Sequence, residues 1–208
     1  MDYNCASASS GTKIRYATQN NICDGNGGWS VETGTVSIGG VTHKTVELAG
    51  MTILAENVKT STSSSRCFEG NNNHSCTHGR LYTYAEASTI CPTGWHLLDS
   101  AEYKTIYDTA YYYSGHLYSM NVFSRESGAW QSFSAPHYDE YGINIFGTGY
   151  CSATGNCEMN MREAYIWLAC SSETSTTCPA RKFTDQRAHT TVFMDKKSYL
   201  GVRCVKDR

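Results

Sequence analysis

Short runs of apolar residues, separated by glycines and polar residues, recur along the whole sequence. They predict a strand at Val31–Ile38 and two further strands, Lys44–Leu48 and Met51–Ala55, with Gly50 in the turn between them. Three more strands are expected later in the chain, at Ala164–Cys170, Thr190–Met194 and Tyr199–Val205. None of these runs reaches the roughly 18 residues of a membrane span, so the pattern predicts no transmembrane helix.

Two segments in the first half of the chain carry the pattern of a helix start. Glu86 follows Thr83 by three residues, and Glu102 follows Asp99 by the same interval, so each pair of side chains can satisfy backbone N–H groups of a first turn. The first pair predicts a short helix to about Cys91, where a proline and a glycine follow. The second predicts a helix with one apolar face, formed by Tyr103, Ile106 and Tyr107. We therefore expect an α+β fold, with two helices on a twisted antiparallel sheet.

The remaining segments predict loops and an N-terminal arm. Residues 61–79 and 111–160 are rich in Gly, Ser, Asn and Tyr, and long ordered loops of this kind usually carry function. Residues 1–40 are polar and Gly-rich, and we interpret them as a polar arm with one strand. The predicted division is thus an arm at 1–40 and a main domain at 41–208.

The composition narrows the class of function. The 208 residues include 17 Lys and Arg against 19 Asp and Glu, a net charge of −2, whereas a nucleic-acid-binding surface needs an excess of basic residues. Charged residues make up only 17%, and there are 15 tyrosines, so the surface is expected to consist of Ser, Thr, Asn, Gly and Tyr, as secreted binding surfaces do. We expect no nucleic-acid partner and an extracellular or cell-surface location. The polar residues after Met1 are interpreted as the start of a trimmed mature chain.

Ten cysteines point to disulfide bonds, because an even and high number is typical of exported proteins. Eight of them form couples that each close a short polar loop: Cys5/Cys23, Cys67/Cys76, Cys151/Cys157 and Cys170/Cys178. The two left over, Cys91 and Cys204, predict a long-range bridge. A competing interpretation is zinc, because Cys67, His74, Cys76 and His78 lie within 12 residues, but their spacing matches no standard zinc pattern.

Four segments resemble one protein family, in the family's order. They read KTVELAGMTILAENVKT, GRLYTYAEASTICPTGWHLLDSAEY, AYIWLACSSET and SYLGVRCVKD, and the family is the Fibrobacter succinogenes major paralogous domain. The resemblance covers about residues 41–208, and it implies a C-type-lectin-like fold of the formylglycine-generating-enzyme-like subgroup, on exported bacterial proteins. It also implies that a cysteine after the first helix is bonded to the last strand, which falls on Cys91 and Cys204. The chain departs from the family pattern at Ile53, Leu98 and Ala169–Cys170.

Catalysis receives little support from the sequence. Cys170 and Cys178 match the redox cysteines of formylglycine generation by position only, and Asp139 and Glu140 are adjacent loop carboxylates, which rarely face one active site. The sequence contains no GxSxG, HExxH, P-loop or GxGxxG motif. We therefore predict no enzymatic activity and no cofactor. Oxygen ligands of the same loop could chelate calcium, but the Glu-Pro-Asn and Trp-Asn-Asp signatures of calcium-dependent lectins are absent.

The four tryptophans divide into two pairs. Trp95 and Trp167 lie in the family motifs and are expected in the core, since a buried indole anchors a small loop-rich fold. Trp29 and Trp130 lie in Gly- and Ser-rich surroundings and are expected to expose their rings for stacking.

Ligand recognition is the predicted function. We expect a non-catalytic extracellular or cell-surface recognition or adhesion module, which binds a surface glycan or a protein ligand through aromatic loops. The expected ligand-binding residues are Tyr111, Tyr112, Tyr113, Tyr118, Trp130, His137 and Tyr138. Two alternatives stay open: a variable ligand-binding protein of a diversity-generating retroelement, with its variable surface near 171–198, and a structural subunit of a pilus or envelope assembly.

Overall fold

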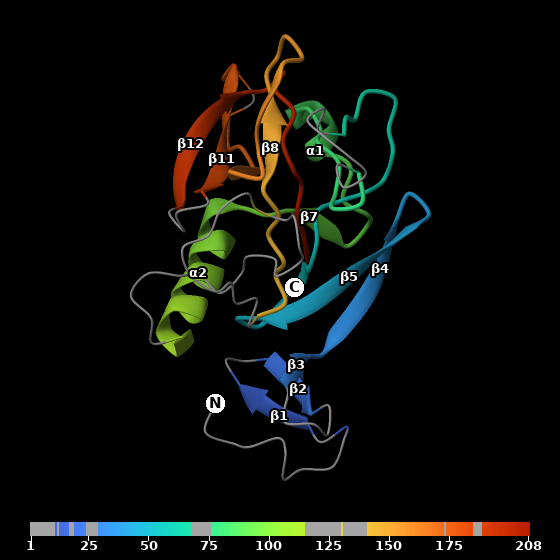
Figure 1. Cartoon of the computed structure of the whole chain (residues 1–208), viewed down its shortest axis with the longest axis vertical. Coiled ribbons are helices and arrows are strands. Elements are labelled where there is room, and N and C mark those ends of the chain that lie inside the picture. The colour runs from blue at the N-terminus through green and yellow to red at the C-terminus, as the bar shows by residue number, and fades with distance from the viewer. Residues whose placement is uncertain are drawn as a thin grey trace.

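The computed structural model describes a sheet-rich α+β chain (Figure 1). The described residues are 11, 13–16, 19–23, 29–67, 76–114, 130, 141–172, 174–184 and 189–208. The helices are α1 (Tyr84–Ala87) and α2 (Ser100–Ser114). The strands are β1 (Lys13–Tyr16), β2 (Gln19–Cys23), β3 (Trp29–Val31), β4 (Thr33–Ile38), β5 (Val41–Leu48), β6 (Met51–Leu54), β7 (Trp95–Leu97), β8 (Thr148–Cys151), β9 (Cys157–Asn160), β10 (Glu163–Trp167), β11 (Thr177–Thr184), β12 (His189–Asp195) and β13 (Cys204–Lys206).

One five-stranded sheet has the order β4-β5-β6-β13-β7. The predicted hairpin of β5 and β6 is confirmed, and its turn residues Ala49 and Gly50 have φ values of 56° and 73°. Two consecutive positive φ angles define the turn that matches the twist of a tight hairpin. Strand β4 pairs with β5 along its whole length. The expected arm at 1–40 therefore shares residues 33–38 with the sheet of the main domain.

The second five-stranded sheet has the order β12-β11-β10-β8-β9. Strands β10 and β12 were predicted, whereas β8 and β9 lie in the 111–160 segment that was expected to be a loop. That expectation is wrong for residues 148–151 and 157–160, where Gly- and Ser-rich chain still forms a ladder across the Cys151–Cys157 bridge. Strand β11 was not predicted, because Pro179, Arg181 and Lys182 interrupt its apolar pattern. Its pairing to β10 and β12 forms nonetheless, and Pro179 contributes its carbonyl to Leu168.

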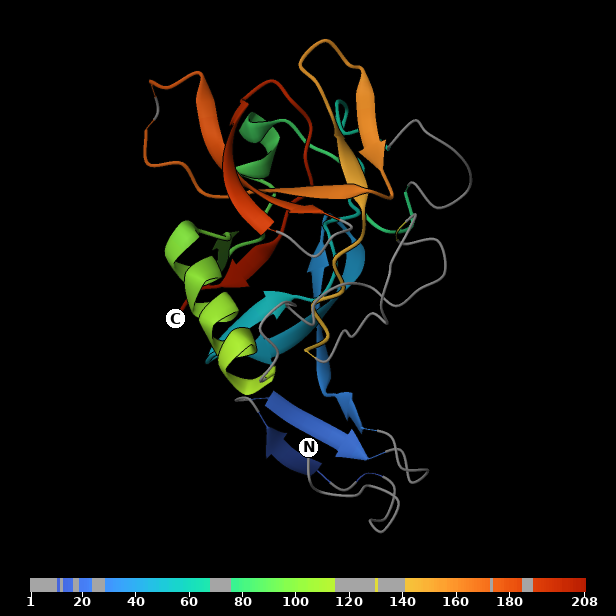
Figure 2. The ribbon, with the colours of Figure 1, turned by 60° about the vertical axis from the view of Figure 1, so that its left-hand side comes forward.

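Both predicted helix starts are confirmed. Glu86 accepts a hydrogen bond from the backbone N–H of Thr83 at 3.2 Å, and Asp99 and Glu102 accept from each other's N–H groups at 2.7 and 3.1 Å. Helix α1 ends at Ala87, earlier than predicted, and α2 continues to Ser114. Figure 2 shows α2 running along one side of the molecule, from the β11–β12 hairpin past β5 and β6.

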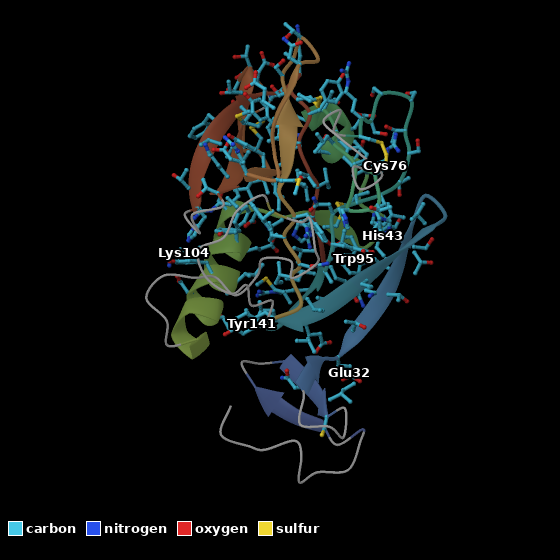
Figure 3. All side chains as sticks on the ribbon, viewed as in Figure 1. Glu32, His43, Cys76, Trp95, Lys104 and Tyr141 are labelled. Atoms are coloured by element: carbon cyan, nitrogen blue, oxygen red, sulfur yellow. A yellow bond between two sulfur atoms is a disulfide. The ribbon has the colours of Figure 1, made fainter. Side chains whose placement is uncertain are left out.

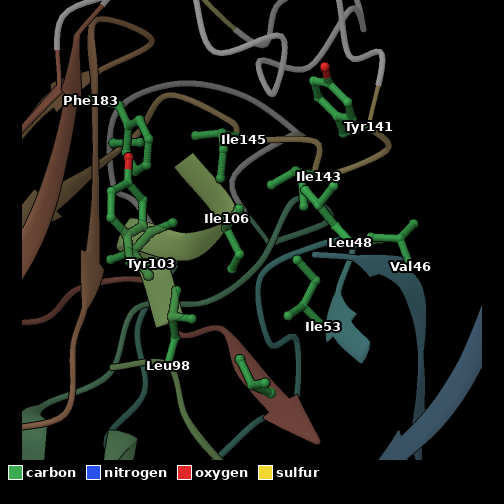
Figure 4. Packing of buried hydrophobic residues seen from close by; sticks show 14 of the residues in the cluster. Val46, Leu48, Ile53, Leu98, Tyr103, Ile106, Tyr141, Ile143, Ile145 and Phe183 are labelled. Atoms are coloured by element: carbon green, nitrogen blue, oxygen red, sulfur yellow. The ribbon is translucent and has the colours of Figure 1, made fainter. Parts of the chain in front are cut away.

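Strand β10 separates two hydrophobic cores. Ala164 and Ile166 face the core beneath α2, where Tyr103 lies beside Phe183 (Figure 4). Tyr165 and Trp167 face the core beneath α1. This double burial explains the uninterrupted apolar run of the AYIW segment. The indole N–H of the fully buried Trp167 donates to the Tyr82 carbonyl at 2.8 Å, so the predicted core role of Trp167 is confirmed.

Disulfides join these elements as predicted. The structure contains Cys67–Cys76, Cys91–Cys204, Cys151–Cys157 and Cys170–Cys178. Cys23 is also disulfide-bonded, and its expected partner Cys5 lies outside the described residues. The bridge from Cys91, after α1, to Cys204, in β13, spans 113 residues. It fixes the C-terminal strand to the helical half of the chain.

A buried guanidinium connects β6 to the segment that precedes β8. Arg203 is only 4% exposed and donates from Nε to the Asn57 side chain at 2.8 Å. Its other nitrogens donate to the carbonyls of Leu54, Ile143 and Asn144 at 2.7–2.9 Å. Gly201 makes room for this junction, because a Cβ there would lie 3.1 Å from the Asn57 amide nitrogen. We call Asn57 and Arg203, together with the three carbonyls to which Arg203 donates, the Arg203 junction.

The N-terminal residues form a separate three-stranded sheet, β1-β2-β3. It lies at one end of the molecule, below β4 and β5 in Figure 1. No helix in the described part of the chain is long and apolar enough to cross a membrane.

Candidate ligand-binding groove

Six of the seven aromatic residues predicted to bind ligand have side chains that lie outside the described structure. Tyr111, Tyr112 and Tyr113 belong to the last turn of α2, and their side chains are outside the described residues. Tyr118, His137 and Tyr138 also lie outside them. The prediction of an exposed aromatic surface built from these residues stays untested.

Trp130 does not offer the exposed ring that its surroundings suggested. It is only 7% exposed, belongs to the core beneath α2, and donates its indole N–H to the Ile145 carbonyl at 3.0 Å. The sequence around Trp130 is polar, but residues distant in the sequence bury it. The side chain of Trp29, the other predicted stacking ring, is outside the described residues.

A groove of about 840 Å³ opens at the end of the molecule opposite β1–β3. In Figure 1 this end holds α1 and the upper part of β8. Four segments contribute: the start of α1, the β8–β9 turn, the loop after β10, and the turn between β12 and β13. The lining residues are Thr83, Tyr84, Ala85, Ser88, Ala153, Cys170, Ser172, Lys196, Lys197 and Tyr199. We call this the α1 groove.

Backbone hydrogen bonds fix the α1 groove to its neighbours. The N–H of Tyr84 donates to the Lys196 carbonyl at 2.9 Å, and the N–H of Lys196 donates to the Thr176 carbonyl at 3.0 Å. Tyr199 exchanges backbone hydrogen bonds of 2.8 and 3.0 Å with Cys151. The loops on both sides are also closed by Cys151–Cys157 and Cys170–Cys178. The groove is therefore held open before any ligand binds.

Two tyrosine rings line the α1 groove, and a cationic side chain lies over each of them. The ring of Tyr84 packs edge-on against Trp167 at 5.4 Å, and its hydroxyl accepts the N–H of Cys170 at 2.8 Å. The ammonium of Lys196 lies 5.7 Å from the centre of that ring. The guanidinium of Arg66 lies 4.4 Å above the ring of Tyr199. Such cations are attracted by the negative face of an aromatic ring.

A second, smaller hollow of about 380 Å³ lies on one face of the β4-β5-β6-β13-β7 sheet, which we call the β4–β7 sheet. Threonines dominate its lining, together with the half-buried Trp95. It also contains Glu32, Glu47 and Lys206, so charges of both signs meet there. Figure 3 labels Glu32 and Trp95.

Two histidines outside the α1 groove make hydrogen bonds within the scaffold, and their pKa values are shifted in opposite directions. His43 is fully buried, and burial lowers its pKa below the ordinary value of 6.5. Its Nε2 accepts the N–H of Lys59 at 2.8 Å, so the proton resides on Nδ1, 2.9 Å from the Val41 carbonyl.

His96 is 42% exposed and connects β7 to α2 and to the C-terminal residues. Partial burial alone would lower its pKa, but hydrogen bonds to Asp207 at 2.6 Å and Glu102 at 2.9 Å, with the charges of these carboxylates, raise the pKa above 6.5. His96, Glu102 and Asp207 all fall in the segments that resemble the family.

The cysteine alternatives to structural disulfides are not supported. Cys67 and Cys76 are bonded to each other, so neither thiolate is available to zinc, and the His78 ring stacks on Phe146 at 3.8 Å. The described residues contain no group of three or more His, Cys, Asp or Glu side chains that could hold a metal ion. Cys170 and Cys178 form the bridge beside the α1 groove, the loop staple that sequence reasoning also offered for them.

The sequence did not reveal the α1 groove, because its residues come from four distant segments. Ser172, Lys196 and Lys197 do fall in the 171–198 region proposed as a variable surface. A strand was predicted there only at Thr190–Met194, but β11 and β12 together occupy most of the region. The sequence signal available for this groove was the pair of adjacent lysines, Lys196 and Lys197, before the last predicted strand.

The comparisons with known proteins concern the whole chain. Residues 2–206 match the model of the Fibrobacter succinogenes major domain, and the match includes residues 2–40, which the resemblance of the four segments did not cover. Searches of curated proteins and of solved structures find no match. The family model covers nearly the whole chain and agrees with the four resembling segments. The chain belongs to the Fibrobacter succinogenes major domain family.

Proposed function

We propose that the chain is a non-catalytic recognition module of the cell exterior, and that it binds a carbohydrate or protein ligand in the α1 groove. The observation that carries this proposal is the groove itself: about 840 Å³, lined by two tyrosines, two lysines and several hydroxyls, between two disulfide-closed loops. A site that is already ordered avoids part of the entropic cost of binding. The disulfides support an extracellular location, because they persist in oxidising compartments.

The proposed architecture is C-type-lectin-like. Its support is the Cys91–Cys204 bridge, which joins the segment after α1 to the last strand as the family resemblance implied. In this arrangement α2 and the terminal strands form the scaffold, and ligand chemistry is left to the start of α1 and the loops around the groove.

Binding in the α1 groove is expected to be weak for a single copy. An aromatic contact contributes about 0.5–1.5 kcal/mol beyond its buried area, and Tyr84 and Tyr199 provide two such rings. Display of many copies on a surface would supply the avidity that one copy lacks.

The test fills the groove without removing a core contact. The full chain is screened on glycan and protein arrays, with and without calcium, beside two variants. Ala153→Trp places a large ring at an exposed lining position, and Ala101→Trp does the same on an exposed face of α2. We expect array binding to be lost in Ala153→Trp and kept in Ala101→Trp. Binding that survives Ala153→Trp would place the ligand elsewhere.

A structural role in an envelope assembly is the second candidate, favoured by strand β12. This strand is an edge of its sheet, and Phe193 on it is 71% exposed. Edge strands with apolar side chains can pair with a neighbouring chain. Sedimentation of the chain and of Phe193→Ser tests this role: self-association that Phe193→Ser abolishes supports it, and a monomer at all concentrations contradicts self-assembly through β12.

A further inference from the structure

The charges of the α1 groove narrow the class of its ligand. We infer that the groove binds an acidic oligosaccharide, a short chain of sugars that carry carboxylate groups; this inference rests on the proposed function of the same groove. Three observations carry it: fixed cations, carboxylates that are engaged elsewhere, and a lining of hydroxyls and aromatic rings.

The cations of the α1 groove are held in place by the fold. Lys196 donates to the Ser172 carbonyl at 3.2 Å and lies over the Tyr84 ring, so its ammonium is kept at the wall of the groove. Arg66, which is not a lining residue, is held beside Tyr199 by that ring and by the Gly155 carbonyl at 3.3 Å. Lys197 lines the groove and is exposed. A cation that is already positioned loses less entropy when it binds an anion.

Two carboxylates that neighbour lining residues in the sequence accept backbone N–H groups. Among the described lining residues, none is Asp or Glu. Asp195 accepts the backbone N–H of Lys197 at 2.8 Å, and Glu86 accepts the N–H of Thr83 at 3.2 Å at the start of α1. The described lining itself therefore contains two ammonium groups and no carboxylate, although the whole chain has a net charge of −2.

The rest of the lining suits a sugar better than a peptide. Thr83, Ser88 and Ser172 contribute hydroxyls, which can both donate and accept hydrogen bonds to sugar hydroxyls. Tyr84 and Tyr199 contribute aromatic carbon to the lining, next to the cations that lie over their rings. Peptides are commonly bound at a free strand edge or in an apolar groove, whereas the apolar side chains of the described lining are two alanines and Cys170 besides the tyrosines.

The test compares pairs of probes that differ only in charge. Oligosaccharides of galacturonate, glucuronate and mannuronate are titrated into the full chain at low salt, each beside its neutral methyl ester. We expect at least one acidic oligosaccharide to bind about tenfold or more tightly than its own ester, since each charge-assisted hydrogen bond contributes about 1.5–3 kcal/mol. Its affinity should fall as salt is added, because exposed charges are screened.

Matched pairs of lysine variants test whether Lys196 and Lys197 are the residues that bind the carboxylates of the oligosaccharide. Lys196→Ala with Lys197→Ala should weaken binding of the acidic oligosaccharide about tenfold. The control, Lys44→Ala with Lys104→Ala, removes two exposed ammoniums outside the groove and should leave the affinity within about twofold, as an exposed charge at that distance is screened. Glu173, in the Cys170–Cys178 loop, lies outside the described residues, and Glu173→Gln should leave binding unchanged or stronger.

The outcomes separate this inference from the proposed function. Equal affinity for every acid and its ester, no loss on removal of Lys196 and Lys197, or weaker binding in Glu173→Gln would each overturn the acidic ligand. If Ala153→Trp still abolishes binding of a neutral glycan or a protein, the groove keeps its proposed function and only its charge preference is wrong. If acidic oligosaccharides bind Ala153→Trp as tightly as the unchanged chain, the groove is not the site.

Discussion

The Arg203 junction and the α1 groove both contain cationic side chains, but they use them in opposite ways. Arg203 is buried and donates to Asn57 and to three backbone carbonyls, so its hydrogen-bonding capacity serves the fold. Lys196 and Lys197 line an open groove. A buried guanidinium whose contacts are removed is costly, whereas an exposed ammonium is nearly neutral for stability.

This difference shows what the family motifs encode. Asn57 and Arg203 come from the AEN and VRC parts of the resembling segments, and Trp167, Cys91 and Cys204 also come from such segments. Each of these residues packs, bonds or crosslinks inside the molecule. In the α1 groove, Lys196, Lys197 and Ala153 lie outside the four segments, whereas the other lining residues, both tyrosines included, fall within them. The motifs therefore contribute the scaffold and most of the lining of the groove, and the two lysines are added from outside them.

The largest difference in the free energy of unfolding is expected between the removal of two disulfides. In the chain-entropy model, Cys91→Ala with Cys204→Ala costs about 5 kcal/mol, because the bridge spans 113 residues. Cys170→Ala with Cys178→Ala costs about 2–3 kcal/mol for a separation of 8 residues. Denaturant unfolding measures both. We expect only the second pair to lose array binding while the protein remains folded, and an equal loss of stability would remove the distinction between scaffold and groove.

Arg203→Met is expected to lower the free energy of unfolding by about 3–5 kcal/mol, because the Asn57 side chain and three carbonyls lose a charged donor. Lys196→Met should change it by no more than about 0.5 kcal/mol. Should Arg203→Met not fold, Arg203→Lys keeps the charge with fewer donors and reports the same trend. Comparable stability of Arg203→Met and Lys196→Met would contradict the structural role of the junction.

Trp130→Phe is expected to cost about 2 kcal/mol, from the lost hydrogen bond to Ile145 and the smaller ring. Its ligand affinity should match that of the unchanged chain. A Trp130→Phe variant with full stability but weaker binding would show that Trp130 contacts the ligand and does not support the core.

The smallest effects concern the two histidines, and they have opposite signs. The pKa of His43 is lowered in the folded state, so its contribution to stability is present above pH 6.5 and is lost as the pH falls through the lowered value. The pKa of His96 is raised, so its contribution is present below pH 6.5 and is lost as the pH rises through the raised value.

Unfolding at pH 5.5 and 8.5 therefore separates these histidines. His96→Gln should destabilise the protein more at pH 5.5 than at pH 8.5, whereas His43→Phe should flatten the loss of stability on the acid side. NMR titration of the two imidazoles checks the directions independently. A His96→Gln effect that grows with pH would show that its carboxylate contacts do not form.

The sequence predicted the local features of this fold better than its tertiary ones. The two capping pairs and the neighbouring cysteine couples depend on residues a few positions apart, and the structure confirms them wherever it describes them. Strand β11 was missed because Pro179, Arg181 and Lys182 interrupt its apolar pattern, and Trp130 was misplaced because distant residues cover it. The groove joins four distant segments, and no pattern within one segment indicates that they meet.

Hydrogen–deuterium exchange with the tightest-binding ligand from the arrays tests the central claim most directly. Slower exchange of backbone amides is expected at 83–88, 152–155, 170–172 and 195–199, with the Arg203 junction and the face of the β4–β7 sheet unchanged. A footprint at the end of α2 or on that sheet face, without protection around the α1 groove, would contradict the assignment of the groove as the ligand-binding site.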